Sequence, residues 1–382
     1  MEKHDERRRV FIVPFYIGVV MGGIVVSGLI CLIPIYLKII GYGGAEIGLG
    51  GTLMSVPYVL ITLLLYPVYS VFKDSRLYSL SALLISGATL LLLFTNALFA
   101  IYLAQIIIGA SLAIYYPVAE IIITKLYPPE ERAKIYGLFG ASWSIGYLVG
   151  PSLSGVLLEI TDIQTTLITL LLLSLSSFLS LLLFRIRLST NNESPKMGKP
   201  KMLRPFFAAT SIFSGMTAVV VSVLPGIVKG LGYEASLIGY SYSLFSLSRL
   251  VGFLSVSRAK IQPTLGNISV TTFCSVLPLM MLVRLEIQAL LPLSLLMLGM
   301  LVSLFNSLTY LYMTNSIGGD TVLLISRYEF YIGTGFLIAP VVAGVVADNY
   351  GASGMITLSM MLCIVSGLIM LSMKPQSRRS LS

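Results

Sequence analysis

Charged residues are scarce in this sequence. Asp, Glu, Lys and Arg make up 11% of its 382 residues, whereas hydrophobic residues make up 56%. In soluble domains about a quarter of all residues are charged, so this composition excludes an ordinary soluble globular protein. It predicts a polytopic membrane protein whose surroundings are a lipid bilayer.

Histidine and cysteine are nearly absent. The only histidine is His4 in the polar N-terminal tail, which excludes a histidine-based metal centre and a Ser-His-Asp triad. Cys31, Cys274 and Cys363 are scattered through apolar segments, which argues against a disulfide framework or a thiolate metal site. No nucleotide-binding loop of the Gly-x-x-x-x-Gly-Lys type occurs, so ATP is not the driving force. We therefore expect no metal and no cofactor.

Apolar runs of membrane-spanning length follow one another along the chain. Each is near the roughly 20 residues that a bilayer requires. The predicted spans are about 10–37, 47–72, 77–95, 97–124, 133–158, 163–184, 205–230, 235–256, 264–283, 287–313, 322–347 and 352–373. The first run is too long for a signal-peptide core, so we expect it to be retained as a helix.

Basic residues are distributed asymmetrically between the two sides of the membrane. An even number of spans places both termini on one side, and that side holds all 25 Lys and Arg except Lys38, Lys229 and Arg284. Cytoplasmic loops carry the excess of basic residues, so we expect both termini in the cytoplasm and the protein in the cell membrane. Topology thus accounts for the net charge of +9, and no nucleic-acid partner is expected.

The chain divides into two halves that repeat each other. A polar stretch at 185–204 separates six spans from six, so we expect bundles at 1–184 and 205–382 joined by a cytoplasmic linker. A set of residues in the first half recurs 191 positions later in the second. These residues are Pro34, Lys38, Gly41, Tyr42, Ile47, Gly48 and Ser55, matched by Pro225, Lys229, Gly232, Tyr233, Ile238, Gly239 and Ser246. The repeat predicts an all-α fold of two pseudo-symmetric six-helix bundles.

A stripe of small residues marks the fifth span. Ser142, Gly146, Gly150 and Ser154 recur every fourth residue and form one face of a helix. Such a stripe lets a neighbouring helix approach closely in lipid. Pro151 removes a backbone donor, so the helix is expected to bend there. An ordinary, tightly packed transmembrane helix would show the same stripe.

The spacing in this span resembles the fifth-helix signature of antiporters in the major facilitator superfamily. The residues that carry the resemblance are Gly137, Gly146, Gly150, Pro151, Ser154 and Gly155, with Ser154 in place of a family glycine. The eleventh span has counterparts at Gly335, Pro340 and Gly344. The turn PIYLKIIGYGGAEIG at 34–48 and the loop PPEERAKIYG at 128–137, Arg132 included, are similar to the same family. The resemblance implies twelve helices, a substrate site near the bilayer midplane and alternating access.

Two stretches depart from the family pattern. The loop SVFKDSRLY after the second span keeps only Asp74, Lys73 and Arg76 in kind. In the fourth span, Gln105 stands four residues before Gly109, where many proton-coupled drug antiporters carry Arg. Because Gln is neutral, it cannot lower the pKa of a carboxylate as Arg could. This substitution argues against proton coupling of the usual drug-antiporter kind.

Polar side chains inside the predicted spans are functional candidates. Glu120 shares a helical face with Gln105 and Tyr116, and is either a protonatable group in a cavity wall or a carboxyl that reaches cytoplasmic water. Trp143, Asn306 and Tyr310 either line a substrate cavity or pack between helices. Arg249, Arg327 and Glu329 lie toward the cytoplasmic ends of their spans, so we expect an inner gate there. The resemblance adds Asp74, Arg76 and Arg132 to this gate and brings Asp74 toward Arg327.

We interpret the chain as a secondary transporter that exports a small organic solute, driven by proton influx. The alternative is an uptake permease, a facilitator or symporter, for a sugar or another metabolite. A polytopic membrane enzyme or a transporter-like sensor is a remote alternative, because an enzyme needs paired acids, bases or metal ligands at membrane depth. The expected partners are the solute, protons and lipid, and we expect a monomer.

Overall fold

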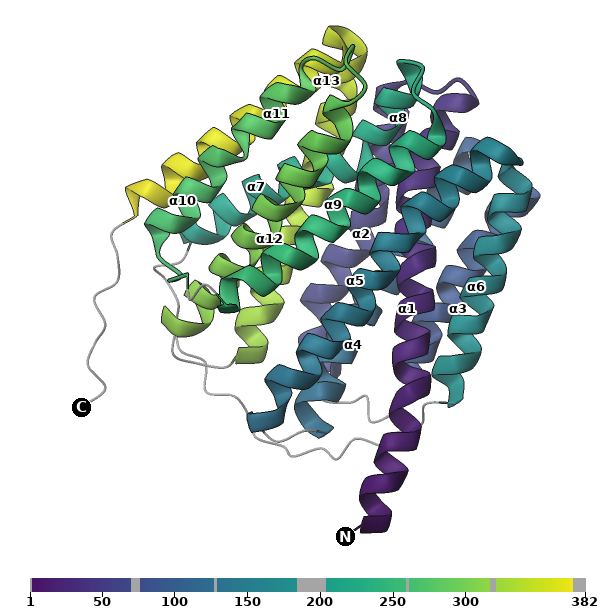
Figure 1. Cartoon of the computed structure of the whole chain (residues 1–382), viewed down its shortest axis with the longest axis vertical. Coiled ribbons are helices and arrows are strands. Elements are labelled where there is room, and N and C mark those ends of the chain that lie inside the picture. The colour runs from purple at the N-terminus through teal and green to yellow at the C-terminus, as the bar shows by residue number, and fades with distance from the viewer. Residues whose placement is uncertain are drawn as a thin grey trace.

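Helices make up the described part of the computed structural model (Figure 1). The backbone is described for residues 2–69, 76–126, 129–183, 204–258, 261–316 and 321–373. Side chains are described for residues 13–63, 77–115, 139–140, 142–183, 204–255, 261–313 and 326–373.

The N-terminal half consists of six helices. They are α1 (Glu2–Ile39), α2 (Gly44–Tyr69), α3 (Arg76–Phe94), α4 (Leu98–Leu126), α5 (Pro129–Ile160) and α6 (Ile163–Leu183). Within this half α1 packs on α5 and α6, while α4 packs on α2 and α3. The C-terminal half repeats the arrangement on the other side of the molecule in Figure 1.

Proline interrupts two of the crossings in the C-terminal half. Its helices are α7 (Arg204–Ser222), α8 (Leu224–Gly230), α9 (Ala235–Arg258), α10 (Leu265–Cys274), α11 (Val276–Leu282), α12 (Leu290–Ser316) and α13 (Thr321–Ser372). Pro225 and Pro278 lack the backbone N–H that would continue the helical hydrogen bonds. The seventh predicted span is therefore α7 followed by α8, and the ninth is α10 followed by α11.

The last helix, α13, contains the eleventh and twelfth predicted spans. Its apolar part covers 47 residues, which as one straight helix would reach about 70 Å against a hydrocarbon core of about 30 Å. Gly351 interrupts it with φ 69°, a left-handed conformation that glycine adopts without a steric penalty. The segments before and after Gly351 are thus two crossings. This accounts for the difference between twelve predicted spans and the eleven candidate spans among the described residues.

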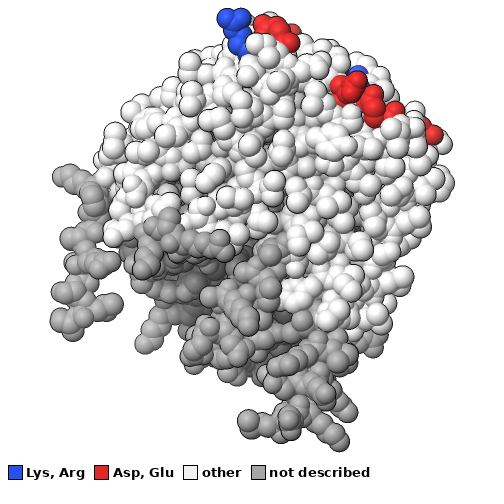
Figure 2. All heavy atoms as spheres, in the orientation of Figure 1, with Lys and Arg blue, Asp and Glu red and all other residues white. Residues whose placement is uncertain are grey.

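A wide band without charged side chains crosses the face of the molecule seen in Figure 2. On the face seen in Figure 2 the coloured charges gather at the top, where the α1–α2, α5–α6 and α8–α9 turns and Gly351 lie. We call this the distal side, opposite the beginning of α1 and the end of α13. Large apolar side chains such as Leu172 and Leu368 are exposed in the band, as expected for surfaces that face lipid.

The small-residue stripe of α5 lies against α1. A methyl group placed on Gly146 would lie 2.7 Å from the Cα of Gly23, and one on Gly150 would lie 2.8 Å from the backbone N of Gly28. The C-terminal half has the same contact, because a methyl group on Gly335 of α13 would lie 2.7 Å from the backbone N of Gly215 in α7. Each half therefore holds its signature helix close to its first helix.

On the distal side, the two halves meet where glycines of one half pack directly on the backbone of the other. The large contacts between them are α2 with α13 and α5 with α9, and α1 adds a smaller one with α8. A methyl group on Gly48 would lie 2.8 Å from the carbonyl carbon of Pro340, and one on Gly239 would lie 3.0 Å from that of Pro151. These two contacts are related by the internal repeat, and they close the molecule on the distal side of its centre.

Candidate functional site

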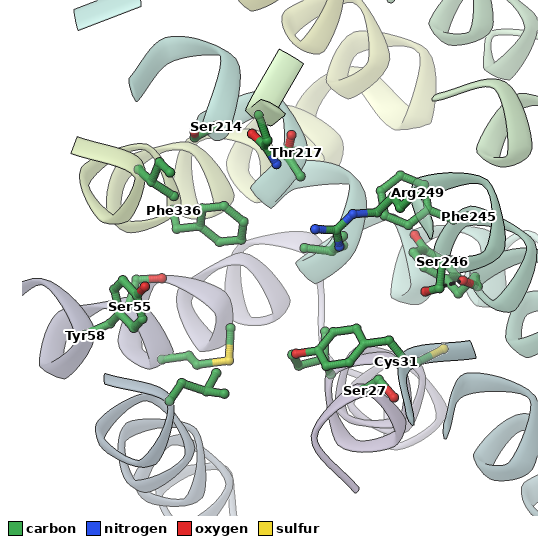
Figure 3. A pocket seen from close by; sticks show the side chains of 18 of the residues that line it. Ser27, Cys31, Ser55, Tyr58, Ser214, Thr217, Phe245, Ser246, Arg249 and Phe336 are labelled. Carbon is green, nitrogen blue, oxygen red and sulfur yellow. Dashed lines mark hydrogen bonds between the residues drawn. The ribbon is translucent and has the colours of Figure 1, made fainter. Parts of the chain in front are cut away.

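A cavity of about 330 Å³ lies between the two halves, and Figure 3 shows side chains that line it. Helices α1, α2, α4 and α5 line it from one half and α7, α9, α12 and α13 from the other. The lining residues are Ser27, Ile30, Cys31, Met54, Ser55, Tyr58, Leu112, Trp143, Tyr147, Pro151, Ser214, Thr217, Val221, Tyr242, Phe245, Ser246, Arg249, Asn306, Glu329, Ile332, Gly333 and Phe336. Its volume lies in the range of about 300–1,000 Å³ typical of small-molecule sites.

The cavity wall is aromatic and carries few charges. Its aromatic residues are Tyr58, Trp143, Tyr147, Tyr242, Phe245 and Phe336. Among the described lining residues only Arg249 and Glu329 are charged. A wall of this kind favours solutes with a large apolar or aromatic body and one or two polar groups.

Glu329 is held from the opposite half. The Tyr58 hydroxyl of α2 donates to Glu329 Oε2 of α13 over 2.7 Å. Gly333, one turn further along α13, leaves room for the Tyr58 ring, since a methyl group there would lie 3.2 Å from Tyr58 Cδ1. The carboxylate therefore has one fixed donor and lies in the cavity wall, where it can accept a hydrogen bond or a proton from a solute or water.

Arg249 lies among aromatic rings. Its guanidinium carbon is 5.5 Å from the ring centroid of Trp143, 5.7 Å from that of Phe245 and 6.0 Å from that of Phe253. Figure 3 shows the side chain reaching from α9 toward the centre of the cavity. Cation–π attraction holds the guanidinium there, and its contact with Trp143 joins α9 of one half to α5 of the other.

Two symmetry-related serines are among the polar residues of the wall, which also include Ser27, Ser214, Thr217 and Asn306. Ser55 of α2 and Ser246 of α9 are 191 residues apart and both line the cavity. Each donates its hydroxyl proton to a carbonyl of its own helix, Ser55 to Gly51 over 3.2 Å and Ser246 to Tyr242 over 3.1 Å. Their oxygens therefore present acceptor lone pairs to a solute.

The residues predicted for a substrate cavity divide into three groups. Trp143 and Asn306 line the cavity. Gln105 does not, because it is buried beside Gly50 between α4 and α2, and Tyr310 packs edge-on against Tyr328 with ring centroids 6.3 Å apart. The side chains of Tyr116 and Glu120 lie outside the described residues.

The residues predicted for an inner gate are also dispersed. Arg249 and Glu329 line the cavity, while Arg327 is half-buried two residues before Glu329. Asp74 and the side chains of Arg76 and Arg132 lie outside the described residues. The expected approach of Asp74 to Arg327 therefore stays a prediction.

Sequence reasoning missed Tyr58, Tyr147 and most of the cavity's other aromatic residues. The internal repeat held a signal for one of them. Three residues beyond Ser55 and Ser246, the same shift of 191 pairs Tyr58 with Arg249. Tyr58 is therefore equivalent by the repeat to a charged residue of the second half.

Comparison with known proteins identifies the family. The model of the Major Facilitator Superfamily matches residues 15–322. The quinolone resistance protein NorA of Staphylococcus aureus is 23% identical over 159 residues. That alignment covers 40% of this chain and 39% of the relative, so the chain matches well under half of the relative's length.

Solved structures share the fold over nearly the whole chain. A bacterial homologue of the human lysosomal transporter Spinster has a TM-score of 0.69 at 12% identity and covers 95% of both chains. The nucleoside transporter NupG gives 0.71 at 14% identity, covering 94% of this chain and 98% of its own. The human organic anion transporter MFSD10 gives 0.68 at 14% identity, covering 95% and 99%. These likenesses confirm the predicted all-α fold, and the family match together with the apolar helices confirms a multi-pass membrane protein.

Proposed function

Because the chain belongs to the major facilitator superfamily and is a transporter rather than an enzyme, we propose that it exports a small amphiphilic organic solute by alternating access. The observation that carries this proposal is the cavity between the halves, lined by aromatic rings with one guanidinium and one carboxylate. A solute there would contact both halves at once, and rocking of the halves would expose it first to one side and then to the other.

The cavity supports a particular chemical class of solute. A planar apolar body can stack on Trp143 and Phe245, and a polar group can reach Arg249, Glu329 or the serine oxygens. A multiply charged anion would have to leave water for an aromatic wall with a single guanidinium among its described residues, which is costly. A sugar would gain less from these rings than a planar aromatic body would, although Ser27, Ser214, Thr217 and Asn306 add polar groups to the wall.

Export is supported by the antiporter signature of α5 and by the partial likeness to a protein named for quinolone resistance. The alternative, uptake of a sugar or metabolite, would use the hydroxyl and amide groups of the same wall, and the flux assay below separates it from export. We further propose that both termini are cytoplasmic, so that the distal side faces outward. Leu231, exposed in the α8–α9 turn, tests this topology. A single cysteine at Leu231 should react with an impermeant maleimide in intact cells, whereas one at position 193 should not.

Proton influx is the proposed driving force, with two candidate carboxyls. Glu329 lies in the cavity wall beside Tyr58, where a solute and a proton would meet the same group. Glu120 is the other candidate, on the fourth crossing. Glu329→Gln and Glu120→Gln separate the two, since the variant that loses pH-driven accumulation but keeps counterflow exchange identifies the coupling carboxyl.

Flux into sealed vesicles tests the proposal. The purified protein is reconstituted into liposomes and assayed with neutral, singly cationic and singly anionic aromatic dyes and with a sugar, each with and without a pH gradient. We expect dye transport to exceed sugar transport and to be accelerated by the gradient. Sugar movement without dye movement would establish the uptake alternative, and no flux of any solute would refute the proposed substrate class.

A further inference from the structure

Two carboxylates join the halves at their distal ends. Asp348, near the distal end of the first crossing of α13, accepts hydrogen bonds from the backbone N–H groups of Gly44 over 2.6 Å and Ala45 over 2.7 Å at the beginning of α2. Glu159, at the distal end of α5, accepts one from the backbone N–H of Ala235 over 2.7 Å at the beginning of α9. Each carboxylate thus caps a helix of the opposite half.

The two caps are related by the internal repeat. Asp348 follows Glu159 by 189 residues, the same shift that relates Pro340 to Pro151, and Ala235 follows Gly44 by 191. The same carboxylate-to-helix contact is therefore built twice from side chains of different length. We call these contacts, Asp348 on α2 and Glu159 on α9, the cross-half caps.

The cross-half caps can form only while the distal side is closed. The first N–H groups of a helix have no partner within it and carry a partial positive charge, which a carboxylate satisfies. Because each cap joins two halves, opening the distal side separates both carboxylates from their helices and returns them to water. The caps therefore favour the distal-closed state.

Asp162 provides an internal comparison. It also caps a helix, accepting a hydrogen bond over 2.7 Å from the backbone N–H of Thr165 in α6. Asp162 and α6 belong to the same half, so this bond persists whichever side is open. Loss of the carboxylate–helix hydrogen bond at Asp162 is thus expected to change the folding stability. Loss of the same kind of bond at Asp348 or Glu159 is expected to change the opening equilibrium.

We propose that Asp348 and Glu159 are positioning residues for transport that set the balance between distal-closed and distal-open molecules. This inference rests on the alternating access proposed above, but it depends on neither the solute nor the direction of transport. Both carboxylates are exposed, so each cap is expected to change the equilibrium about 2- to 5-fold, the range for a charged group at an exposed helix terminus. Losing both is expected to change it about 10-fold.

Distance measurements between spin labels test the inference without any solute. Two label pairs span the distal side of a protein in which Cys31, Cys274 and Cys363 are replaced by Ala. One pair joins Asn96, in the α3–α4 turn, to Tyr350 of α13, and the other joins Gln164, at the beginning of α6, to Leu231 in the α8–α9 turn. Each pair joins the two halves, and all four positions are exposed. Asp348→Asn and Glu159→Gln should each increase the long-distance population of both pairs, and the double variant should increase it further. Asp348→Glu should restore part of the wild-type distribution.

The control is Asp162→Asn, which should lower thermal stability and leave both distance distributions unchanged. Unchanged distributions in the Asp348→Asn and Glu159→Gln variants would overturn the proposal, as would an equal shift in Asp162→Asn. Should the variants fail to fold, the wild type in 1 M salt gives the second measurement, because salt weakens the attraction between an exposed carboxylate and the partial charge of a helix terminus. Its distributions should move toward longer distances, and their failure to move would also overturn the proposal. The distance measurements use no solute, so they test the inference even if the vesicle assay shows no dye flux.

Discussion

Tyr58 and Arg249 occupy equivalent positions in the two halves, 191 residues apart, and each reaches across the cavity to the opposite half. Tyr58 donates to Glu329 of the C-terminal half, and Arg249 lies over Trp143 of the N-terminal half. The same position of the repeat has thus become a neutral donor in one half and a cation in the other. The cavity is symmetric in its architecture and asymmetric in its charge, so a solute with two different ends has one preferred orientation.

Solute binding should change the fluorescence of Trp143. This is the only tryptophan in the chain and it lines the cavity, so the intrinsic emission reports on this site alone. Titration of the purified protein with a transported dye should give a saturable change. Arg249→Lys keeps the charge but loses the planar group over the ring, and should weaken the apparent affinity about 5-fold, or about 1 kcal/mol of cation–π and stacking energy. A saturable change that Arg249→Lys leaves unaltered would remove Arg249 from the binding contacts.

Tyr58→Phe should impair transport without impairing folding. The change removes the donor to Glu329 Oε2, and a hydrogen bond to a charged group contributes about 1.5–3 kcal/mol. Because this bond joins the two halves within the cavity, we expect dye flux to fall at least 10-fold. Tyr233→Phe is the matched control, since the Tyr233 hydroxyl donates over 2.6 Å to the Leu285 carbonyl within the C-terminal half. Equal loss of flux in both variants would mean that Tyr58 acts only through general packing.

Gly150→Leu should abolish transport while the protein still inserts into the membrane. A side chain at Gly150 collides with Ile24, Ser27 and Gly28 of α1, so α5 can no longer approach that helix. Gly87→Leu is the control, because a methyl group at Gly87 of α3 meets no described atom within 4 Å. Membrane yield and dye flux are measured for both. Wild-type flux in Gly150→Leu would show that close packing of α5 on α1 is not required.

The stability contributed by Asp162 should disappear in acid. The backbone N–H of Thr165 holds the pKa of this carboxyl below its ordinary value near 3.8. A carboxyl whose pKa is lowered by folding stabilises the folded state above its unfolded pKa, and this contribution is lost as the pH falls through the folded pKa. The wild type should therefore melt at a higher temperature than Asp162→Asn at pH 7, and the difference should begin to shrink as the pH falls below the ordinary value near 3.8 and vanish below the lowered pKa of the folded state. A difference in melting temperature that persists unchanged at pH 3 would contradict this assignment.

The sequence was sufficient for the crossings and the two-fold repeat, because both depend on composition and spacing alone. The cavity was harder to predict, because the residues that line it depend on how each helix is rotated about its own axis. Gln105 and Gly109 share a face of α4, but a methyl group on Gly109 would lie 2.7 Å from the carbonyl carbon of Met54. This face therefore packs on α2, and Leu112 lines the cavity instead. Only the packing of α4 on its neighbour reveals that rotation.

For Arg249 the uncertain quantity is its depth along the helix axis. Its position in the second half of α9 predicts a gate residue at the edge of the membrane. It lies nine residues before the end of the helix at Arg258, which is about 13 Å along the axis. That distance is enough to place the guanidinium in the cavity rather than at the surface.

The backbone contacts at Gly48 and Gly239 have a kinetic consequence. Where bulky side chains interdigitate, two helices can separate only after rotamers rearrange, because each side chain occupies a recess in its partner. At Gly48 against Pro340, and at Gly239 against Pro151, there is no side chain on the glycine to withdraw. The distal surfaces can slide apart without a succession of rotamer changes. If the halves rock as proposed, we expect these close glycine contacts to add little to the activation barrier for opening the distal side.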